Sequence, residues 1–229
     1  MKKLVVLTGA GISTESGIRT FRDMGGLWEE YDVMEVASSQ AWAKNPELVL
    51  RFYNERRRQL KEVEPNAGHR ALVEAEKYFD VHIITQNVDN LHERAGSSKV
   101  LHLHGELTKA RSTVDERLVY DWGYKDIKWG DCCEKGYQLR PHIVWFGEAV
   151  PAFVQASEIA ATADIFAVIG TSLNVYPAAG LIDYVNPGVP IFLIDPNTVH
   201  ITRSNVKIIK EPASTGTWKM LNLLIEQTN

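Results

Sequence analysis

The sequence LVVLTGAGIS, residues 4–13, joins four consecutive apolar residues to a turn that contains two glycines. Such an apolar run is typical of a strand that is buried on both faces of a parallel sheet. Gly9 and Gly11 follow it, and glycines after a strand let the backbone approach a phosphate closely. The dehydrogenase fingerprint would need a third glycine where Thr14 stands, and no P-loop lysine follows. The stretch therefore predicts a buried strand and a turn, and that turn fits a nucleotide site and a plain tight turn about equally.

Similar short runs rich in β-branched residues recur along the chain, with helical patterns between several of them. The predicted strands are Lys3–Leu7, Val81–Thr85, Val100–Leu103, Ile165–Ile169 and Pro190–Ile194. The predicted helices include Glu47–Val63 and Ala67–Tyr78. Alternation of strands and helices predicts an α/β fold, a Rossmann-like doubly wound parallel sheet.

The region Thr108–Leu139 departs from this pattern. It is polar, rich in Asp, Lys, Gly and Trp, and lacks a long apolar period. We expect a small irregular module there, with the chain returning to the sheet region near His142–Phe146. The expected division of the single domain 1–229 is a core of about 1–30, 67–108 and 143–229 and a small module from insertions of about 31–66 and 109–142.

Composition excludes several classes of protein. Among the 229 residues, 45% are hydrophobic and 24% charged, as in ordinary globular proteins, and the formal net charge of −4 argues against nucleic acid as a partner. The two cysteines, Cys132 and Cys133, are adjacent and make a poor disulfide framework, which suits a reducing cytoplasm. Residues 165–182 carry no charge, but glycines and polar residues interrupt them, so no membrane span is expected. We expect a cytoplasmic monomer.

Polar segments follow two further predicted strands. They are residues 85–90 (TQNVDN) and 170–173 (GTSL). Open α/β sheets bind their ligands at the carboxyl ends of the strands. Together with the Gly9–Gly11 turn, these segments favour a nucleotide site over three unrelated turns.

Two histidines stand in the sequence LHLHGE, residues 101–106. Strand alternation would place His102 and His104 on one face, so a metal pair must be considered, but no third ligand is evident nearby. One of them could act as a general base, because imidazole titrates near neutral pH. The other fits a structural histidine with satisfied hydrogen bonds.

Together these segments resemble the sirtuin family, the NAD-dependent protein deacylases. The matching motifs, in the family's order, are residues 9–13 (GAGIS), 17–22 (GIRTFR), 86–92 (QNVDNLH), 104–105 (HG), 144–148 (VWFGE) and 170–173 (GTSL). They span most of the chain, and the ordered set is far more specific than any one of them.

The resemblance implies NAD as a consumed co-substrate and suggests roles for individual residues. Those expected near the phosphates and ribose are Gly9, Ala10, Phe21 and Arg22. Those expected on the nicotinamide side are Gln86, Asn87 and Asp89. Those expected at the adenosine half are Gly170, Thr171, Ser172, Asn197 and Ala213. The implied catalytic residues are His104, as the base, and Asn87.

The implied reaction moves an acyl group from lysine to ADP-ribose. The acyl carbonyl oxygen attacks the nicotinamide ribose, nicotinamide leaves, and His104 takes a proton so that a ribose hydroxyl can attack the intermediate. The products are nicotinamide and O-acyl-ADP-ribose, with no metal at the reacting centre. The implied partners are acylated-lysine proteins or peptides, which would lie as an added strand between residues 144–147 and 174–176. The implied peptide-binding residues are Val144, Phe146, Gly147 and Val175.

The chain departs from the family pattern at the structural zinc that most sirtuins carry on two cysteine pairs. Ser112 and Asp115 stand where the first pair would lie, and only Cys132 and Cys133 remain for the second. A tetrahedral zinc needs four ligands, and adjacent cysteines chelate one ion awkwardly. We expect no ordinary zinc site, and a module held by the packing of Trp122, Trp129 and their neighbours.

The segment LVLRFYNERRRQL, residues 48–60, contains four arginines. Helical periodicity places Arg56 on the apolar stripe with Tyr53 and Leu60, whereas Arg51 and Arg58 point away and Arg57 lies on the flank. No acidic residue lies three or four positions from Arg56. The periodicity alone favours a distant ion pair or a side chain that reaches solvent.

The resemblance adds a second interpretation of this helix. Tyr53 and Arg56 match the pair that marks sirtuins acting on acidic acyl-lysines, and Ala37 matches the small residue that widens their acyl pocket. The planar guanidinium suits a carboxylate. This predicts removal of succinyl groups, and of malonyl or glutaryl groups, with some deacetylation retained.

Other functions remain open from the sequence. One is a sirtuin that mainly deacetylates or transfers ADP-ribose to protein; another is a module that binds NAD or ADP-ribose without turnover. Rates on succinyl and acetyl versions of one peptide separate the first from a desuccinylase. Nicotinamide release that depends on an acylated peptide excludes the second. Thr14 disfavours a redox dehydrogenase.

Overall fold

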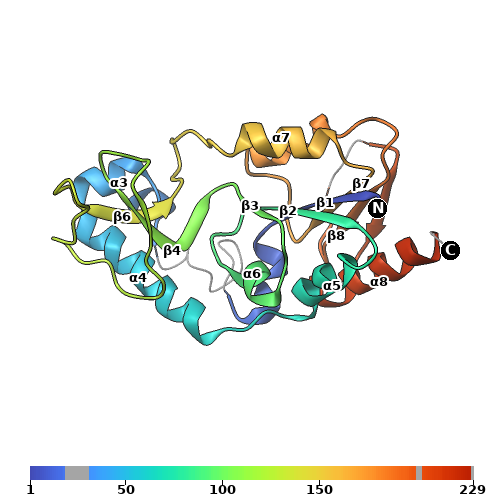
Figure 1. Cartoon of the computed structure of the whole chain (residues 1–229), viewed down its shortest axis with the longest axis horizontal. Coiled ribbons are helices and arrows are strands. Elements are labelled where there is room, and N and C mark those ends of the chain that lie inside the picture. Colours follow the sequence, from blue (N-terminus) through green and yellow to red (C-terminus); the bar gives the residue numbers. More distant parts are fainter. Residues whose placement is uncertain (19–30, 200–202, 228–229) are drawn as a thin grey trace.

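The computed structural model describes residues 1–18, 31–199 and 203–227, which form two sheets (Figure 1). The larger sheet has six parallel strands in the order β3-β2-β1-β7-β8-β9. They are β1 (Lys3–Thr8), β2 (Asp80–Thr85), β3 (Val100–His102), β7 (Ile165–Ile169), β8 (Ile191–Ile194) and β9 (Val206–Ile209). The predicted Rossmann-like parallel sheet is confirmed.

Residues 4–8 of the sequence LVVLTGAGIS lie in β1, which pairs with β2 on one side and β7 on the other. All five predicted strands are present, each within one residue of its expected ends. The sixth, β9, was not predicted, because its four residues include an exposed lysine and form an edge strand. Its pairing with β8 defines it, and pairing is not visible in a short sequence pattern.

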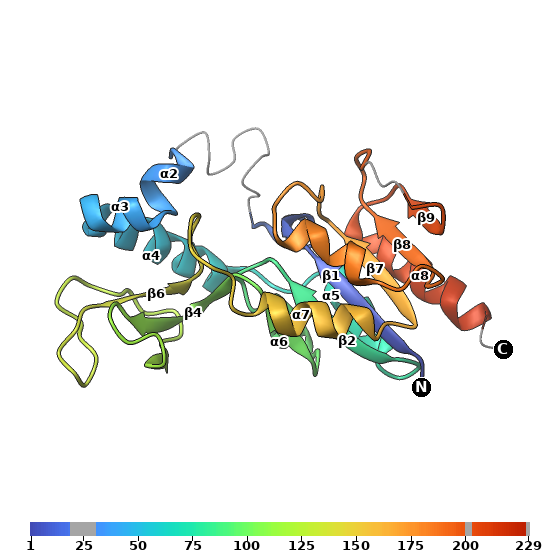
Figure 2. The same cartoon turned by 90° about the horizontal axis from the view of Figure 1, so that it is seen from above.

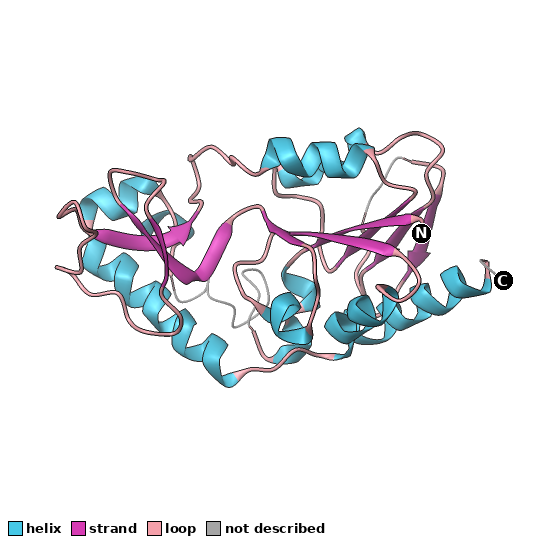
Figure 3. Ribbon diagram, in the orientation of Figure 1, coloured by secondary structure: helices cyan, strands magenta, loops and turns pink. Residues whose placement is uncertain are grey.

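Helices cover both faces of this sheet (Figure 3). Leu4 and Val6 of β1 pack toward α5 (Ala67–Ala75) and α8 (Ala213–Glu226), whereas Val5 and Leu7 pack toward α7 (Phe153–Ala161) and the 3₁₀ segment η3 (Ala178–Tyr184). Burial on both faces explains why the strand is apolar at every position. No helix among the described residues has the length and apolarity needed to cross a membrane.

The second sheet is small and antiparallel. It consists of β4 (Gly105–Ser112), β5 (Val119–Asp121) and β6 (Leu139–Ile143) in the order β5-β4-β6. The expected small module is present, but it is built on this sheet and is therefore not irregular. The expected return to the main sheet near His142–Phe146 was wrong, because His142 and Ile143 pair with β4. These strands mix buried and half-buried positions and carry a bulge, so they lack the alternation that marks a strand in sequence.

Helices complete the end of the molecule that holds the small sheet (Figure 2). They are α2 (Val33–Val36), α3 (Ser39–Lys44) and α4 (Pro46–Glu62). The remaining short elements are η1 (Ala10–Ile12), η2 (Thr14–Ser16) and α6 (Leu91–Ala95). Helix α4 begins one residue before the predicted Glu47, with proline in its first turn and the Asn45 side chain accepting a hydrogen bond from the Leu48 N–H at 3.1 Å. Helix α5 ends three residues before the predicted Tyr78.

Candidate active site

The turns that follow β1 and β7 are packed directly against each other. Gly9 donates its N–H to the Ile169 carbonyl at 3.0 Å, and Gly11 donates to the Gly170 carbonyl at 2.9 Å. A Cβ at Gly9 would lie 2.6 Å from the Cβ of Thr171, and Gly170 has a φ of +62°. These contacts require glycine whether or not a ligand is bound. The backbone N–H of Ala10 donates to no other described residue and is half-buried, so it is available to a ligand.

The third polar segment, which follows β2, is hydrogen-bonded to these two turns. The Gln86 side chain donates to the Thr171 hydroxyl at 3.2 Å, and Thr8 donates to Thr85 at 2.8 Å beneath it. Because β2, β1 and β7 are neighbours in the sheet, their carboxyl ends lie side by side at one edge. The three segments that the sequence singled out are therefore brought together.

Asn87 and Asp89 are fixed by the turn after β1. The Asn87 side-chain N–H₂ group donates to the Gly9 carbonyl and to the Ser13 hydroxyl, both at 3.1 Å. Ser13 in turn donates to Asp89 at 3.0 Å. With both of its N–H groups engaged, Asn87 has only its side-chain oxygen left for a ligand. Burial raises the pKa of Asp89, while hydrogen bonds from Leu91 and Ser13 oppose the rise.

Sequence reasoning did not assign a role to Ser13, although it is almost fully buried and joins Asn87 to Asp89. Its place directly after the glycine turn was the available signal. Asp195, at 7% exposure and just beyond the carboxyl end of β8, was also missed. A polar residue that follows a buried strand was the signal there.

His104 is held with one ring nitrogen toward the protein. Its Nδ1 lies 3.0 Å from the Gln86 carbonyl, which can only accept, so Nδ1 carries the proton and Nε2 presents a lone pair. Burial lowers the pKa of His104, although the bond to Gln86 opposes this. The next residue, Gly105, has a φ of +81°, and a Cβ there would lie 2.1 Å from the His142 carbonyl. This turn, at the junction of the two sheets, holds the His104 ring with its Nδ1 proton toward Gln86.

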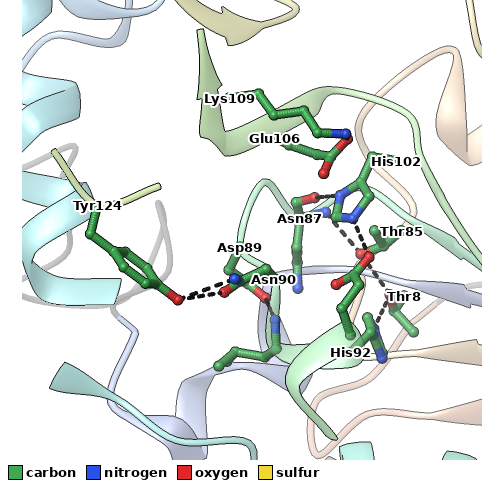
Figure 4. Close-up of polar contacts among 12 residues, drawn as sticks. Thr8, Thr85, Asn87, Asp89, Asn90, His92, His102, Glu106, Lys109 and Tyr124 are labelled. Carbon is green, nitrogen blue, oxygen red and sulfur yellow. Dashed lines mark hydrogen bonds and ion pairs between the residues drawn. The ribbon is translucent and has the colours of Figure 1, made fainter. Parts of the chain in front are cut away.

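His102 has both ring nitrogens engaged (Figure 4). Its Nδ1 donates to the Asn87 carbonyl at 3.0 Å, and its Nε2 donates to Glu93 at 2.8 Å. Burial lowers its pKa, but the Glu93 carboxylate outweighs burial and the net shift is upward. His102 is thus a structural histidine. The described residues contain no group of three or more His, Cys, Asp or Glu side chains that could hold a metal ion.

Tyr53 and Arg56 lie on α4 at the boundary between the sheets. Tyr53 is 2% exposed, and the Trp145 indole donates to its hydroxyl at 3.1 Å. Arg56 is half-buried, and its Cζ lies 5.6 Å from the centre of the Phe52 ring. Burial lowers the pKa of Arg56, and the nearby Tyr53 and Asp89 oppose this.

The arginine that is fully buried is Arg57, which the periodicity placed on the flank of the helix. It donates to the Leu107 carbonyl at 2.7 Å and to Asn54 at 2.8 Å, and burial lowers its pKa to about 10. The expectation that Arg56 alone faces inward was therefore wrong. Strand β4 covers the flank of α4, so a single apolar stripe does not describe this helix.

A model of the Sir2 family matches residues 9–177. The chain belongs to this family. It is 54% identical over 230 residues to an NAD-dependent protein deacylase of Helicobacter pylori strain J99, covering 100% of this chain and 98% of that protein. It is 54% identical over 235 residues to an NAD-dependent protein deacylase of Bacteroides thetaiotaomicron, covering 98% and 99%. A solved Sir2 homologue in complex with NAD aligns with a TM-score of 0.89 at 38% identity, covering 100% of this chain and 91% of that one.

In this Sir2-family chain, the segment after β6 connects the two sheets. Val144 donates its N–H to the His104 carbonyl and Phe146 donates to the Ala37 carbonyl, both at 2.9 Å. Ala37 itself is 7% exposed and packs in the same apolar cluster as Tyr53. Gly147 has a φ of +87°, and Phe146 is 48% exposed.

The expected adenosine residues lie along the far part of the same edge. Asn197 is exposed beyond β8 and donates its N–H to Asp195 at 2.8 Å. Ala213 is the first residue of α8 and is buried. Ser172 is exposed, and Val175, which was expected to bind the peptide, is half-buried. Phe21 and Arg22 lie outside the described residues.

The segments where family members carry zinc ligands are joined here by other bonds. The Cys133 thiol donates to Ser112 at 3.6 Å, and Lys135 forms an ion pair with Asp115 at 2.8 Å. Cys132 is exposed. Of the two tryptophans expected to hold the module, Trp122 is half-buried and donates to the Asp126 carbonyl at 3.2 Å. Trp129 is 59% exposed.

Proposed function

We propose that this protein is an NAD-dependent protein-lysine deacylase that prefers acidic acyl groups, succinyl above all. The proposal rests on the position of His104, where the two sheets meet. His104 lies where the nucleotide-side turns after β1, β2 and β7 meet the segment 144–147, and Tyr53 hydrogen-bonds to that segment through Trp145. We infer that one site combines a neutral base, a nucleotide-binding edge and the side chains of Tyr53 and Arg56.

The residues at the strand ends fit NAD. The Ala10 N–H is available for a phosphate, and Asn87 has its side-chain oxygen left for a ligand. Asp195 and Asn197 lie at the end of β8, where ribose hydroxyls need polar partners. When bound, NAD would supply the electrophilic ribose carbon and the ADP-ribose that receives the acyl group.

His104 would act as the base through Nε2. The Gln86 carbonyl holds the Nδ1 proton, so Nε2 is free to accept a proton from a ribose hydroxyl. Burial keeps the ring neutral at working pH. A fixed tautomer also avoids the loss of rate that follows when the wrong nitrogen carries the proton.

The acylated peptide would add as a strand between residues 144–147 and 174–176. Among the described residues, the backbone N–H groups of Gly147 and Val175 donate to nothing, so each can pair with a substrate backbone. Main-chain pairing makes few demands on side chains, which suits a range of protein substrates.

Tyr53 and Arg56 would receive the acyl carboxylate. Ala37 leaves room in the cluster that contains Tyr53, and Arg56 supplies a planar cation beside it. Arg56→Met keeps most of the side-chain volume and removes the charge. We expect the ratio of desuccinylation to deacetylation, each as kcat/KM, to fall about 100-fold, the size of a lost charge-assisted contact.

The deciding experiment is mass spectrometry of one peptide in succinyl and acetyl forms, with and without NAD, using the wild type and Arg56→Met. NAD-dependent desuccinylation that Arg56→Met reduces selectively supports the proposal. Equal loss of both activities contradicts the acyl assignment. A peptide left intact by the wild type in both forms contradicts the enzyme itself and leaves an NAD-binding module.

We also propose that the protein functions as a cytoplasmic monomer without structural zinc and without nucleic acid. The Cys133–Ser112 and Lys135–Asp115 contacts already join the segments that a zinc ion would hold. Elemental analysis that finds stoichiometric zinc in the purified protein would count against this.

A further inference from the structure

The hydrogen bond between Trp145 and Tyr53 has a fixed direction. An indole N–H can only donate, so the Tyr53 oxygen is the acceptor at 3.1 Å. The Tyr53 O–H proton must therefore point elsewhere. No acceptor for that proton exists among the described residues. Because Tyr53 is 2% exposed, an unused donor there is costly unless a ligand accepts it.

Trp145 is itself held firmly. The Arg140 guanidinium carbon lies 3.3 Å from the centre of the Trp145 ring, and Arg140 donates to Glu148 at 2.7 Å. Glu148 also accepts the Trp145 backbone N–H at 2.9 Å. The ring is therefore clamped from its face and from its backbone, which fixes the direction in which its N–H points.

Trp145 belongs to the segment 144–147, which is proposed to pair with the substrate peptide. Its side chain points back to α4, on which Arg56 follows Tyr53 by three residues. Residues three apart on a helix are neighbours on its surface. The same residue thus links the backbone that would position the acyl-lysine to the phenol that would meet the end of its acyl chain.

We propose that Trp145 is a specificity-determining positioning residue: its indole N–H holds the Tyr53 hydroxyl as a one-way donor toward the terminal carboxylate of the acyl group, beside Arg56. This rests on the proposed preference for acidic acyl groups. A carboxylate only accepts hydrogen bonds, so a phenol that can only donate matches it. An acetyl group ends in a methyl group and gains nothing from this arrangement. Burial raises the pKa of Tyr53, which keeps the proton on the phenol.

The test uses Trp145→Phe, which retains one aromatic ring and removes the indole N–H together with the second ring. We expect the succinyl-to-acetyl ratio of kcat/KM to fall about fivefold, the size of one lost hydrogen bond. The loss should appear in KM for the succinyl peptide rather than in kcat, because the contact serves binding before and during reaction alike.

Trp42→Phe is the matched control. Its ring lies 5.6 Å from that of Trp145, no hydrogen bond of the described residues involves its indole, and we expect no change in the ratio.

A double-mutant cycle with Tyr53→Phe separates positioning from general packing. If Trp145 acts through the Tyr53 hydroxyl, adding Trp145→Phe to Tyr53→Phe lowers the ratio no further. Additive losses, or an unchanged ratio in Trp145→Phe, overturn the inference. Arg56→Met measured in parallel keeps the two claims apart. If it is selective while Trp145→Phe is not, only this inference fails; if it is unselective, the proposed acyl preference fails as well.

Discussion

The two halves of the molecule hold their polar groups in place by different kinds of contact. In the parallel-sheet half, backbone turns and short side chains after β1, β2 and β7 fix one another, as Ser13 does with Asn87 and Asp89. In the small module, long side chains reach across from α4, as Arg57 does to the Leu107 carbonyl. The first kind of contact follows from strand order, whereas the second depends on which helix lies against which strand. This contrast explains where the sequence was informative, and substitutions in each half and at their junction test it.

The largest effect is expected at the junction of the halves. His104→Ala removes the base, and kcat/KM for deacylation should fall about 10²- to 10⁴-fold. The fold and NAD binding should persist, because the His104 side chain makes one hydrogen bond to the described residues, at the Gln86 carbonyl. Steady-state kinetics by nicotinamide release, with NAD affinity by calorimetry, provide the measurement. A fall of less than tenfold would mean that another group takes the proton.

The contact between the two glycine turns is the next test. Gly170→Ala places a Cβ 2.4 Å from the Ile12 nitrogen at a φ of +62°. We expect the free energy of unfolding to fall by about 4 kcal/mol, from positive-φ strain and overpacking together. Urea denaturation measures it, with Gly188→Ala as control, since a Cβ at Gly188 meets nothing within 4 Å. Similar stabilities for the two variants would show that the turns can separate.

A pH effect should follow from a buried histidine pair beneath this site. Burial lowers the pKa of His69 to about 4, and burial with the nearby His69 and His102 lowers that of His92. Below pH 6.5 the unfolded chain binds protons that folded His69 does not bind until about pH 4. Stability should therefore fall as pH drops from 7 to 4, by about 3 kcal/mol for His69 alone.

The matched variant for this pH effect is His69→Gln, whose side-chain oxygen can still accept the Asn66 N–H but cannot titrate. Urea midpoints at several pH values should show that the variant loses less stability on acidification than the wild type. Parallel losses in both proteins would assign the pH effect to other groups.

The same contrast explains how much of the molecule could be predicted. Strands β1 and β7 were found to within a residue, because burial on both faces leaves an unbroken apolar run. The polar residues that follow these strands then indicated the nucleotide side, because neighbouring parallel strands end at the same edge of the sheet. Strands β4 and β6 were missed because their pairing, with a bulge, carries no comparable period.

The arginines of α4 show the limit of periodicity. Helical periodicity alone placed Arg56 on the apolar face and Arg57 on the flank. The Leu107 carbonyl lies against that flank and accepts a hydrogen bond from Arg57, which is fully buried. Only the position of β4 decides between them, and that position is a tertiary fact. The Trp145–Tyr53 bond joins residues 92 positions apart, so no local pattern could have indicated it.

The smallest effects are expected in the small module, where Arg57→Met and Arg58→Met measure them. Arg57→Met removes the bonds to Leu107 and Asn54 but also removes a buried N–H₂ group that lacks a partner among the described residues. We expect a net loss of about 2 kcal/mol, smaller than the cost usual for breaking a buried ion pair. Arg58→Met, which removes only an exposed ion pair with Asp126, should cost less than about 1 kcal/mol. Hydrogen exchange should rise in β4 and β6 and stay unchanged in β1 and β7, because α4 holds the module and not the parallel sheet. Equal acceleration in both sheets would mean that the halves unfold as one unit. They would then differ only in the kind of contact that holds their polar groups.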